Sequence, residues 1–325
     1  MTTLSIKKKE TMLDCQQADA VLAESITKSA SRQTYYTIHF LADHKRSADA
    51  YRAYAYFRWV DDILDAEAGS GTERSAFIQR QKSLLESCYR GESLHYARLE
   101  EQMLVKLIQH DAGRNSGLES YLRNMMSVMA FDANRRGQII SQTELSEYTR
   151  LLATAVTEAM HYFIGHSCTS PQNELRYLAV SAAHITHMLR DTFDDIEAGY
   201  YNIPREILEA NHIAPQDVDS KTYRTWVRSR VQLARTYFQA GKEYLRRVEN
   251  LRCRLAGFAY SARFEWLLDT IEREGYCLRP HYNERKSWGN GLRMSWITLS
   301  SISRWRGAGM TLQTVPVRQR STRSS

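Results

Sequence analysis

The chain has 325 residues, of which 43% are hydrophobic, with 5 prolines, 15 glycines and a formal net charge of +7. This length and composition allow one large buried core, and the sequence has no run of about 18 uninterrupted apolar residues that could span a bilayer. The five cysteines are scattered without a Cys-x-x-Cys pair. We therefore expect neither a zinc site nor a disulfide framework, and we predict a reducing, cytoplasmic compartment.

Residues 1–20 are predicted to be a flexible leader. The basic residues Lys7, Lys8 and Lys9 lie here, but no apolar stretch follows them. A signal peptide needs such a stretch, so none is expected.

Residues 21–286 are predicted to form one all-α domain. Apolar residues recur at helical spacing, the breaks fall at glycine and proline clusters, and no alternation typical of strands persists. The predicted helices lie near residues 18–30, 33–42, 46–66, 73–90, 97–110, 116–135, 143–166, 172–196, 204–210, 220–248 and 252–275.

The predicted helix at 46–66 carries a stripe of residues that changes from aromatic to acidic. Tyr51, Tyr54, Arg58, Asp61 and Asp65 follow a 3-4-3-4 spacing, so they share one helix face. Such a face suits a deep pocket that has an apolar floor and a charged mouth.

The predicted helix at 172–196 carries a parallel stripe, made by Val180, His184, His187, Asp191 and Asp195. In both stripes two aspartates are four residues apart, so their carboxylates lie on the same face. Carboxylates repel one another, and two such clusters at one cavity would be costly without cations.

Hard oxygen ligands of this kind suit Mg²⁺, with Mn²⁺ as an alternative. Mg²⁺ typically takes one or two carboxylates and completes its shell with water and substrate phosphates. Arg58 and Arg190 stand beside the two clusters, and arginine suits bidentate phosphate contact. The pattern predicts a site that binds a diphosphate through metal ions.

Residues 287–325 form a basic tail. Five arginines and no acidic residue lie between Arg304 and the end. We expect either a disordered, solvated tail or contact with anionic lipid. Nucleic acid is not an expected partner, because no binding motif accompanies the charge.

At this point the motifs resemble those of a known family. The stretch 54–65, Tyr-Ala-Tyr-Phe-Arg-Trp-Val-Asp-Asp-Ile-Leu-Asp, is similar to the first signature of squalene/phytoene synthases, and 189–195 with 203–206 is similar to the second. Tyr148 falls where the family has a tyrosine, and 272–276 resembles its closing helix. The resemblance covers roughly residues 25–285, in order.

The resemblance implies an isoprenoid-synthase-type helical bundle around a central apolar cavity. It implies the head-to-head joining of two farnesyl or geranylgeranyl diphosphates, through a cyclopropyl intermediate, to a squalene- or phytoene-like product. It also implies roles for this chain's residues. The metal ligands would be Asp61, Asp65, Asp191 and Asp195; the diphosphate-binding residues would be Arg58 and Arg190; Tyr148 would be catalytic; and Thr34, Tyr35, His184 and Phe264 would contact substrate.

Several positions depart from the family pattern. His187 and His184 stand where the family usually has Asn and Gln, and His187 is a candidate metal ligand. Tyr200 and Asn202 replace the usual Arg and Tyr after the second motif, and Phe264 replaces a tyrosine. The metal core is retained while its surroundings are altered.

Alternatives therefore stay open beside head-to-head synthesis. One is a cyclase, a prenyl hydrolase or a transferase to another acceptor; another is a non-catalytic relative used for assembly or lipid binding. A di-iron bundle, which the spacing of His184, His187 and Asp191 would permit, is the least expected alternative. The pattern does not choose between C15 and C20 substrates, between routes with and without NADPH, or between oligomeric states. Because a C30 or C40 hydrocarbon must leave into a bilayer, we expect the protein to sit at a membrane surface.

Overall fold

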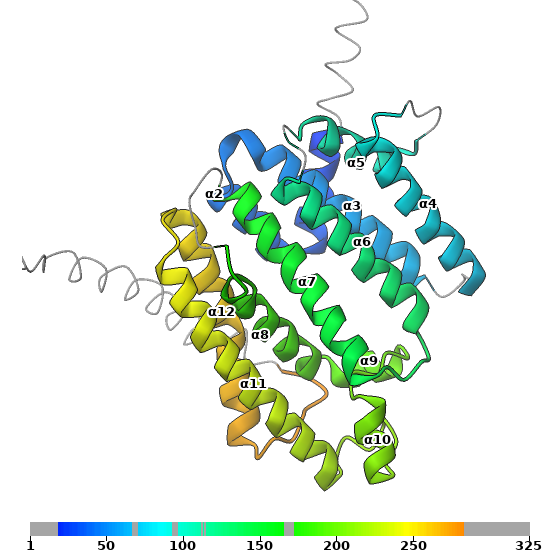
Figure 1. Cartoon of the computed structure of the whole chain (residues 1–325), viewed down its shortest axis with the longest axis vertical. Helices are drawn as coiled ribbons and strands as arrows, with labels where there is room; N and C mark the ends of the chain where they lie inside the picture. The colour runs from blue at the N-terminus through cyan, green and yellow to red at the C-terminus, as the bar shows by residue number, and fades with distance from the viewer. Residues whose placement is uncertain are drawn as a thin grey trace, which may run out of the picture.

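The computed structural model describes residues 19–66, 71–92, 97–111, 113, 115–165 and 172–282. This part of the chain is a bundle of helices (Figure 1), so the predicted all-α fold is confirmed. A helix over residues 19–30 comes first. It is followed by α2 (Arg32–Leu41), a 3₁₀ turn (His44–Arg46), α3 (Ser47–Asp65), α4 (Gly71–Tyr89), α5 (Leu99–Gln109), α6 (Gly117–Arg135), α7 (Gln142–Phe163), α8 (Leu175–Arg190), α9 (Thr192–Glu197), α10 (Arg205–Asn211), α11 (Lys221–Arg246) and α12 (Leu251–Arg273).

Helix starts follow short polar side chains that cap the first backbone N–H groups. Ser141 accepts a hydrogen bond from the Glu144 N–H, and the Glu144 side chain accepts one from the Ser141 N–H in return. Single caps of the same kind begin other long helices, at Ser31, Ser116, Ser220 and Asn250. These local signals explain why most predicted boundaries lie within three residues of the observed ones.

One predicted helix is divided in the structure. The stretch expected to be a single helix at 172–196 breaks at Asp191, which ends α8 and begins α9. The Thr192 hydroxyl donates to the carbonyls of Met188 (2.9 Å) and Leu189 (3.2 Å), so it competes with the regular backbone ladder at this point. Asp195 N–H still bonds to the Asp191 carbonyl at 2.8 Å, which keeps the two residues one turn apart.

The bundle has two main hydrophobic clusters, one mostly from α2–α7 and one mostly from α8–α12. α6 packs along α7, α7 along α8, and α8 along α11 (Figure 1). The last pair approaches closely: a Cβ on Gly241 of α11 would lie 2.5 Å from the Ala179 nitrogen of α8. Glycine at this position is what permits the two backbones to meet.

The two ends of the bundle are built from different connections. At one end, called here the aspartate end, α3 and α6 finish, α7 begins and α8 passes into α9. There Gly137 N–H donates to the Gly199 carbonyl (2.7 Å), and Arg205 N–H to the Ile140 carbonyl (2.8 Å). Ile139 and Tyr201 form an isolated β-bridge, and the described residues contain no strand.

The opposite end, called here the α2 end, is where α2, α7 and α11 finish and α3, α8 and α12 begin. Asp43 N–H donates to the Phe163 carbonyl at 2.8 Å, and the Arg252 guanidinium donates to the Ala42 carbonyl at 3.2 Å. These bonds join the end of α2 to the end of α7 and the start of α12.

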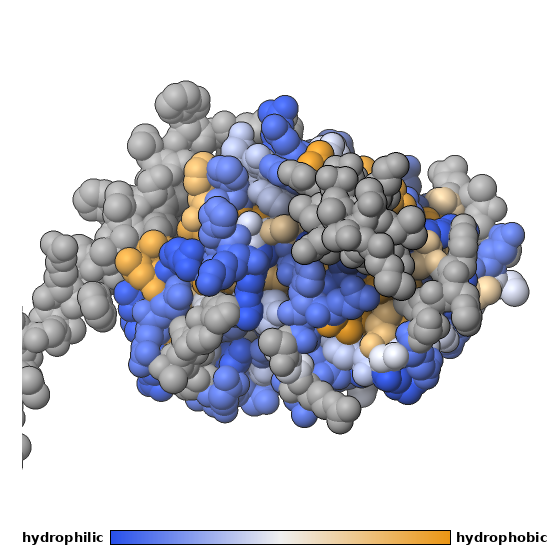
Figure 2. All heavy atoms as spheres, turned by 90° about the horizontal axis from the view of Figure 1, so that it is seen from above, coloured by the Kyte–Doolittle hydropathy of each residue, from blue (hydrophilic) through white to orange (hydrophobic). Residues whose placement is uncertain are grey.

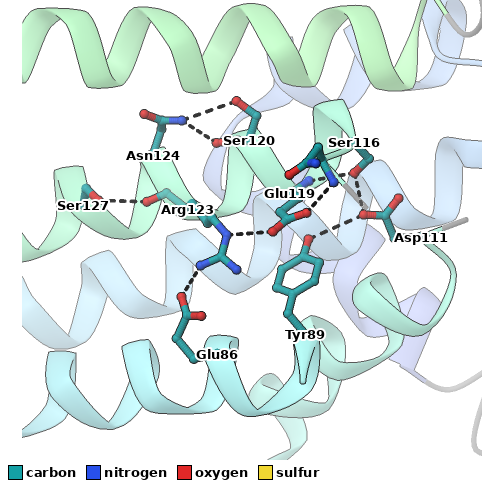
Figure 3. A network of polar contacts seen from close by, with 10 residues as sticks. Glu86, Tyr89, Asp111, Ser116, Glu119, Ser120, Arg123, Asn124 and Ser127 are labelled. Atoms are coloured by element: carbon teal, nitrogen blue, oxygen red, sulfur yellow. Dashed lines mark hydrogen bonds and ion pairs between the residues drawn. The ribbon is translucent and has the colours of Figure 1, made fainter. Parts of the chain in front are cut away.

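A polar network fixes the start of α6 near this second end (Figure 3). Arg123 donates to Glu119 one turn earlier (2.9 Å) and also contacts Glu86 of α4. Ser116, the cap of α6, donates to Asp111 at 2.5 Å, and Tyr89 donates to the same carboxylate at 3.5 Å. Burial raises the pKa of Asp111. The network holds the α5–α6 connection against α4 and lies away from the aspartate clusters.

None of the described helices combines the length and the apolar character that crossing a bilayer requires.

Candidate active site

Carboxylates from α3, α6 and α9 influence one another at the aspartate end. Burial, and then the charge of Asp65, raises the pKa of Asp61 to about 6, and Asp132 of α6 adds to the effect. Burial, and then Asp191, raises the pKa of Asp195 to about 7, and Asp132 contributes again. The charge of Asp132 contributes to the raised pKa of both Asp61 and Asp195, so the three carboxylates border one common region.

A chain of buried and part-buried hydrogen bonds links α6 to the second cluster. Arg135 donates through Nε to Asp132 (2.7 Å) and through Nη1 to the Asn202 side-chain oxygen (2.9 Å). Asn202 in turn donates through Nδ2 to Asp195 at 2.7 Å. Tyr148 of α7 donates its hydroxyl to the other Asp132 oxygen at 2.8 Å. Asp195 is therefore oriented by Asn202, and Asn202 by Arg135.

Aromatic rings surround the Arg135 guanidinium. Its central carbon lies 4.8 Å from the Tyr148 ring centre, 5.0 Å from Tyr200 and 5.6 Å from Phe131. Phe131 and Tyr148 also stack on each other, with centroids 5.0 Å apart. Cation–π contacts of this kind hold a buried guanidinium in one place while Asp132 neutralises it.

Each predicted arginine contacts the carboxylates of its own cluster. Arg58 lies 3.5 Å from Asp61 and also pairs with Asp62. Arg190 donates to both oxygens of Asp191, at 2.5 and 2.6 Å. A diphosphate at either cluster would meet both a carboxylate and a guanidinium.

His187 lies beside the second cluster on the outer part of α8. Its Nε2 is 3.3 Å from Asp191 and contacts Arg190, and its side chain is 48% exposed. The ring meets Phe264 edge-on at 6.1 Å. A pocket of about 250 Å³ opens next to these residues, between the end of α8 and α12, and Arg190, Asp191 and Phe264 line it.

His184 lies one turn deeper and is buried. Its ring meets Tyr148 edge-on at 5.1 Å, and its Nε2 has no hydrogen-bond partner among the described residues. Burial, followed by the charges of His187, Arg135 and Arg230, lowers the pKa of His184 to about 3. The imidazole is therefore neutral at physiological pH.

Thr34 and Tyr35 are not brought to the aspartates. Thr34 bonds with the Ser31 hydroxyl (2.9 Å), and Tyr35 donates to Glu24 (3.2 Å) and stacks on Tyr51 at 5.8 Å. Tyr51 precedes Asp61 by ten residues, which is about 15 Å along the axis of α3. The structure therefore separates these two expected substrate contacts from the clusters.

The carboxylate set fits hard divalent cations without forming a closed cage. Among the described residues, no group of three or more His, Cys, Asp or Glu side chains is close enough to hold a metal ion by itself. Mg²⁺ does not need such a cage, because it keeps waters and takes diphosphate oxygens. Burial first, and neighbouring carboxylates second, raise the pKa values of Asp61 and Asp195, and a bound cation would relieve the repulsion among these carboxylates.

Sequence reasoning missed Asp132 and Arg135 and did not assign a role to Asn202. The available signal was the i, i+3 pair of Asp132 and Arg135 at the end of a predicted helix, but such pairs are common on solvated faces. Only the packing of α6 beside α7 and the α9–α10 connection shows that this pair, a buried Arg135 and a half-buried Asp132, belongs to the site.

The comparisons with known proteins agree with this geometry. The family model described as squalene/phytoene synthase matches residues 27–290. The chain belongs to the squalene/phytoene synthase family.

Members of the squalene/phytoene synthase family with a described function or structure are similar to this chain at low identity. Presqualene diphosphate synthase of Zymomonas mobilis is 27% identical over 197 residues, which are 60% of this chain and 63% of that protein. Squalene synthase of Alicyclobacillus acidocaldarius has a TM-score of 0.66 at 18% identity, covering 81% of this chain and 97% of its own. A dehydrosqualene synthase solved with a ligand has a TM-score of 0.64 at 16% identity, covering 90% and 98%. At these identities the two structures show the shared fold.

Proposed function

We propose that this protein is a prenyltransferase that condenses two prenyl diphosphates head to head. The observation that carries the proposal is the arrangement of Asp61, Asp132 and Asp195, which come from three helices and border one region in a member of the squalene/phytoene synthase family. A presqualene diphosphate synthase among its relatives supports the same reaction class. The product, squalene-like or phytoene-like, depends on how long a substrate the bundle accepts.

We propose Asp61, Asp65, Asp191 and Asp195 as the residues that hold Mg²⁺ together with substrate diphosphate, and His187 as a further ligand. Bound Mg²⁺ would stabilise the departing diphosphate. Arg58 and Arg190 would pass from their carboxylate contacts to phosphate oxygens as the negative charge arrives.

We propose that the aromatic ring of Tyr148 faces the allylic cation that remains after diphosphate leaves. Its hydroxyl proton is held by Asp132, and burial raises its pKa well above the usual range, so the phenol stays neutral. A neutral aromatic face stabilises a cation without being consumed by it. Both oxygens of Asp132 accept hydrogen bonds, one from Arg135 and the other from Tyr148, which lowers their availability for attack on the cation.

A second candidate outcome is favoured by His184. Its unpartnered Nε2 provides a buried polar atom beside Tyr148, at a position where the family usually has Gln. An enzyme that ionises the same substrate but closes a ring or admits water would use such an atom. A non-catalytic role has less support, because clustered carboxylates serve no purpose in a scaffold.

The deciding experiment incubates the protein with farnesyl or geranylgeranyl diphosphate, with and without Mg²⁺, followed by analysis of the extractable products. Head-to-head synthesis predicts a C30 or C40 product, or its cyclopropyl diphosphate precursor, only when Mg²⁺ is present. A prenyl alcohol or a cyclic product of unchanged carbon number would favour the second candidate. Asp61→Asn and Asp191→Asn should each abolish turnover, and normal turnover in both variants would refute the metal role.

A further inference from the structure

Exposed apolar side chains gather at the α2 end of the bundle, away from the aspartates. The large apolar residues that remain exposed in the described part of the chain are Val21 (62%), Tyr36 (52%), Phe40 (69%), Leu99 (47%) and Leu251 (46%). Tyr36 and Phe40 lie on α2, and Leu251 is the first residue of α12 at the α2 end. Figure 2, which views the molecule from above, shows orange apolar groups scattered among blue hydrophilic ones.

The aromatic pair on α2 forms the centre of this surface. Arg32, Tyr36 and Phe40 are spaced i, i+4, i+8, so they form one stripe along the helix. The rings of Tyr36 and Phe40 stack with centroids 6.0 Å apart. Tyr36 also meets Tyr35 edge-on at 5.2 Å and Phe40 meets His39 edge-on at 4.8 Å, yet Tyr36 and Phe40 stay 52% and 69% exposed. The pair therefore offers apolar area that can be buried against something outside the bundle.

Among the described residues, exposed cations lie on α2 and at the α2 end of the bundle. Arg32, Lys45, Arg246 and Arg247 are exposed, and within the described residues none of their side chains forms an ion pair. Glu243 and Glu249 are the exposed acidic residues nearby in α11 and its end, so positive charge remains in excess. Exposed aromatic rings with lysine and arginine nearby are typical of surfaces that bind the headgroup region of an anionic bilayer.

We propose that the α2 end, with Tyr36 and Phe40 at its centre, is a docking surface for an anionic lipid bilayer. The charge excess selects anionic lipid, and the ring pair supplies apolar area to bury. The surface lies opposite the aspartates along the bundle axis, so prenyl chains anchored by their diphosphates at the aspartate end would extend toward the membrane. That use of the surface rests on the proposed function, whereas its binding to lipid does not.

The test measures how the full-length chain binds vesicles in a sedimentation assay. Vesicles of phosphatidylcholine mixed with phosphatidylglycerol are compared with vesicles of phosphatidylcholine alone. The variants are Tyr36→Ser with Phe40→Ser, Lys45→Gln with Arg247→Gln, and Leu99→Ser as a matched control, since Leu99 is also exposed but lies on α5 beside the α4 contact of Glu101. All five positions are exposed, so the fold should tolerate the changes; thermal unfolding checks this.

We expect the aromatic double variant to lose at least about tenfold in affinity for the mixed vesicles, because both rings leave the interface. The charge variant should lose severalfold at low salt and little at high salt, because its contribution is screened. Leu99→Ser should bind like the unchanged protein. Equal binding by the aromatic variant and Leu99→Ser would overturn the proposal, as would equal affinity of the unchanged protein for both kinds of vesicle.

Two further measurements distinguish lipid binding from self-association of the chain, and the docking surface from the proposed reaction. If the aromatic variant alters only the oligomeric mass in solution, the surface is an interface between copies of the chain and the proposal fails. Turnover of farnesyl diphosphate in detergent is measured in parallel. Absence of turnover in the unchanged protein, with vesicle binding still dependent on Tyr36 and Phe40, would refute the proposed function and leave the docking surface standing.

Discussion

An aspartate whose pKa is raised by partial burial weakens the folded state once it ionises, and Asp195 is such a residue. Its folded pKa is about 7, against about 3.8 in an unfolded chain. The folded state therefore binds more protons between these values, and the stability present at low pH is lost as pH rises through 7. His184 and His161 act in the opposite direction, but only below their ordinary pKa of about 6.5, because burial lowers their folded values to about 3 and 4.

The first prediction follows from the direction in which the stability of the folded state changes with pH. In chelator, the melting temperature should rise as pH falls from 8 to 6.5, because Asp195 gains a proton. Asp195→Asn should flatten that rise and increase the melting temperature at pH 8 by a few degrees, while turnover is lost. Thermal scans of both proteins across this range test the prediction, and a steeper pH dependence in the variant would contradict it. Added Mg²⁺ should stabilise the unchanged protein and have little effect on the variant.

His187 gives a second prediction at the residue scale. It lies 3.3 Å from Asp191 and contacts Arg190, so its loss should disturb both a proposed metal ligand and a proposed diphosphate contact. His187→Ala should lower kcat at least about tenfold, which corresponds to an increase of about 1.4 kcal/mol in the activation free energy. His187→Asn, which restores the residue usual in the family, should cost far less. Equal kcat for His187→Ala and the unchanged protein at saturating Mg²⁺ would mean that the histidine only fills space.

At the scale of the elements, the contact between α8 and α11 holds the second cluster in position. Gly241→Ala would place a Cβ 2.5 Å from the Ala179 nitrogen, so the helices would have to separate. We expect a loss of about 1–3 kcal/mol in the free energy of unfolding, the usual cost of overpacking. Gly71→Ala is the matched control, because a Cβ there meets nothing within 4 Å and α4 begins at that residue. Urea unfolding of both variants tests the prediction; equal midpoints would show that the bundle absorbs the contact without cost.

The starts and ends of most helices were predicted correctly from the sequence. Caps such as Ser141 with Glu144 and breaks at glycine and proline are local, so the sequence predicts the start and end of most helices. The division at Asp191 was not predicted. It depends on a threonine hydroxyl that bonds back to the preceding turn, and the apolar periodicity is the same with or without that bond.

At the scale of the whole molecule, the basic tail offers a further prediction. Residues 287–325, including Trp296 to Trp305 and the arginines after it, lie outside the described residues. Trimming 304–325 should weaken binding to anionic vesicles, because about 1 kcal/mol per basic residue near the surface is lost, and should leave the melting temperature unchanged. Vesicle sedimentation of the trimmed and full-length chains measures this. Unchanged affinity would remove the tail from the membrane contact and leave the α2 end to carry it.

The sequence by itself determined the helical class and the two pairs of aspartates. It also determined the family, because spacing on a helix and conspicuous motifs are local properties of the chain. Only the tertiary structure decided which side chains share the site. It added Asp132, Arg135 and Asn202, because hydrogen bonds between residues 67 positions apart depend on how α6 meets the α9–α10 connection. It also placed Thr34 and Tyr35 apart from the clusters, because Tyr35 stacks on Tyr51 in the first half of α3 and the aspartates lie at the end of that helix. Their contact with substrate stays a prediction.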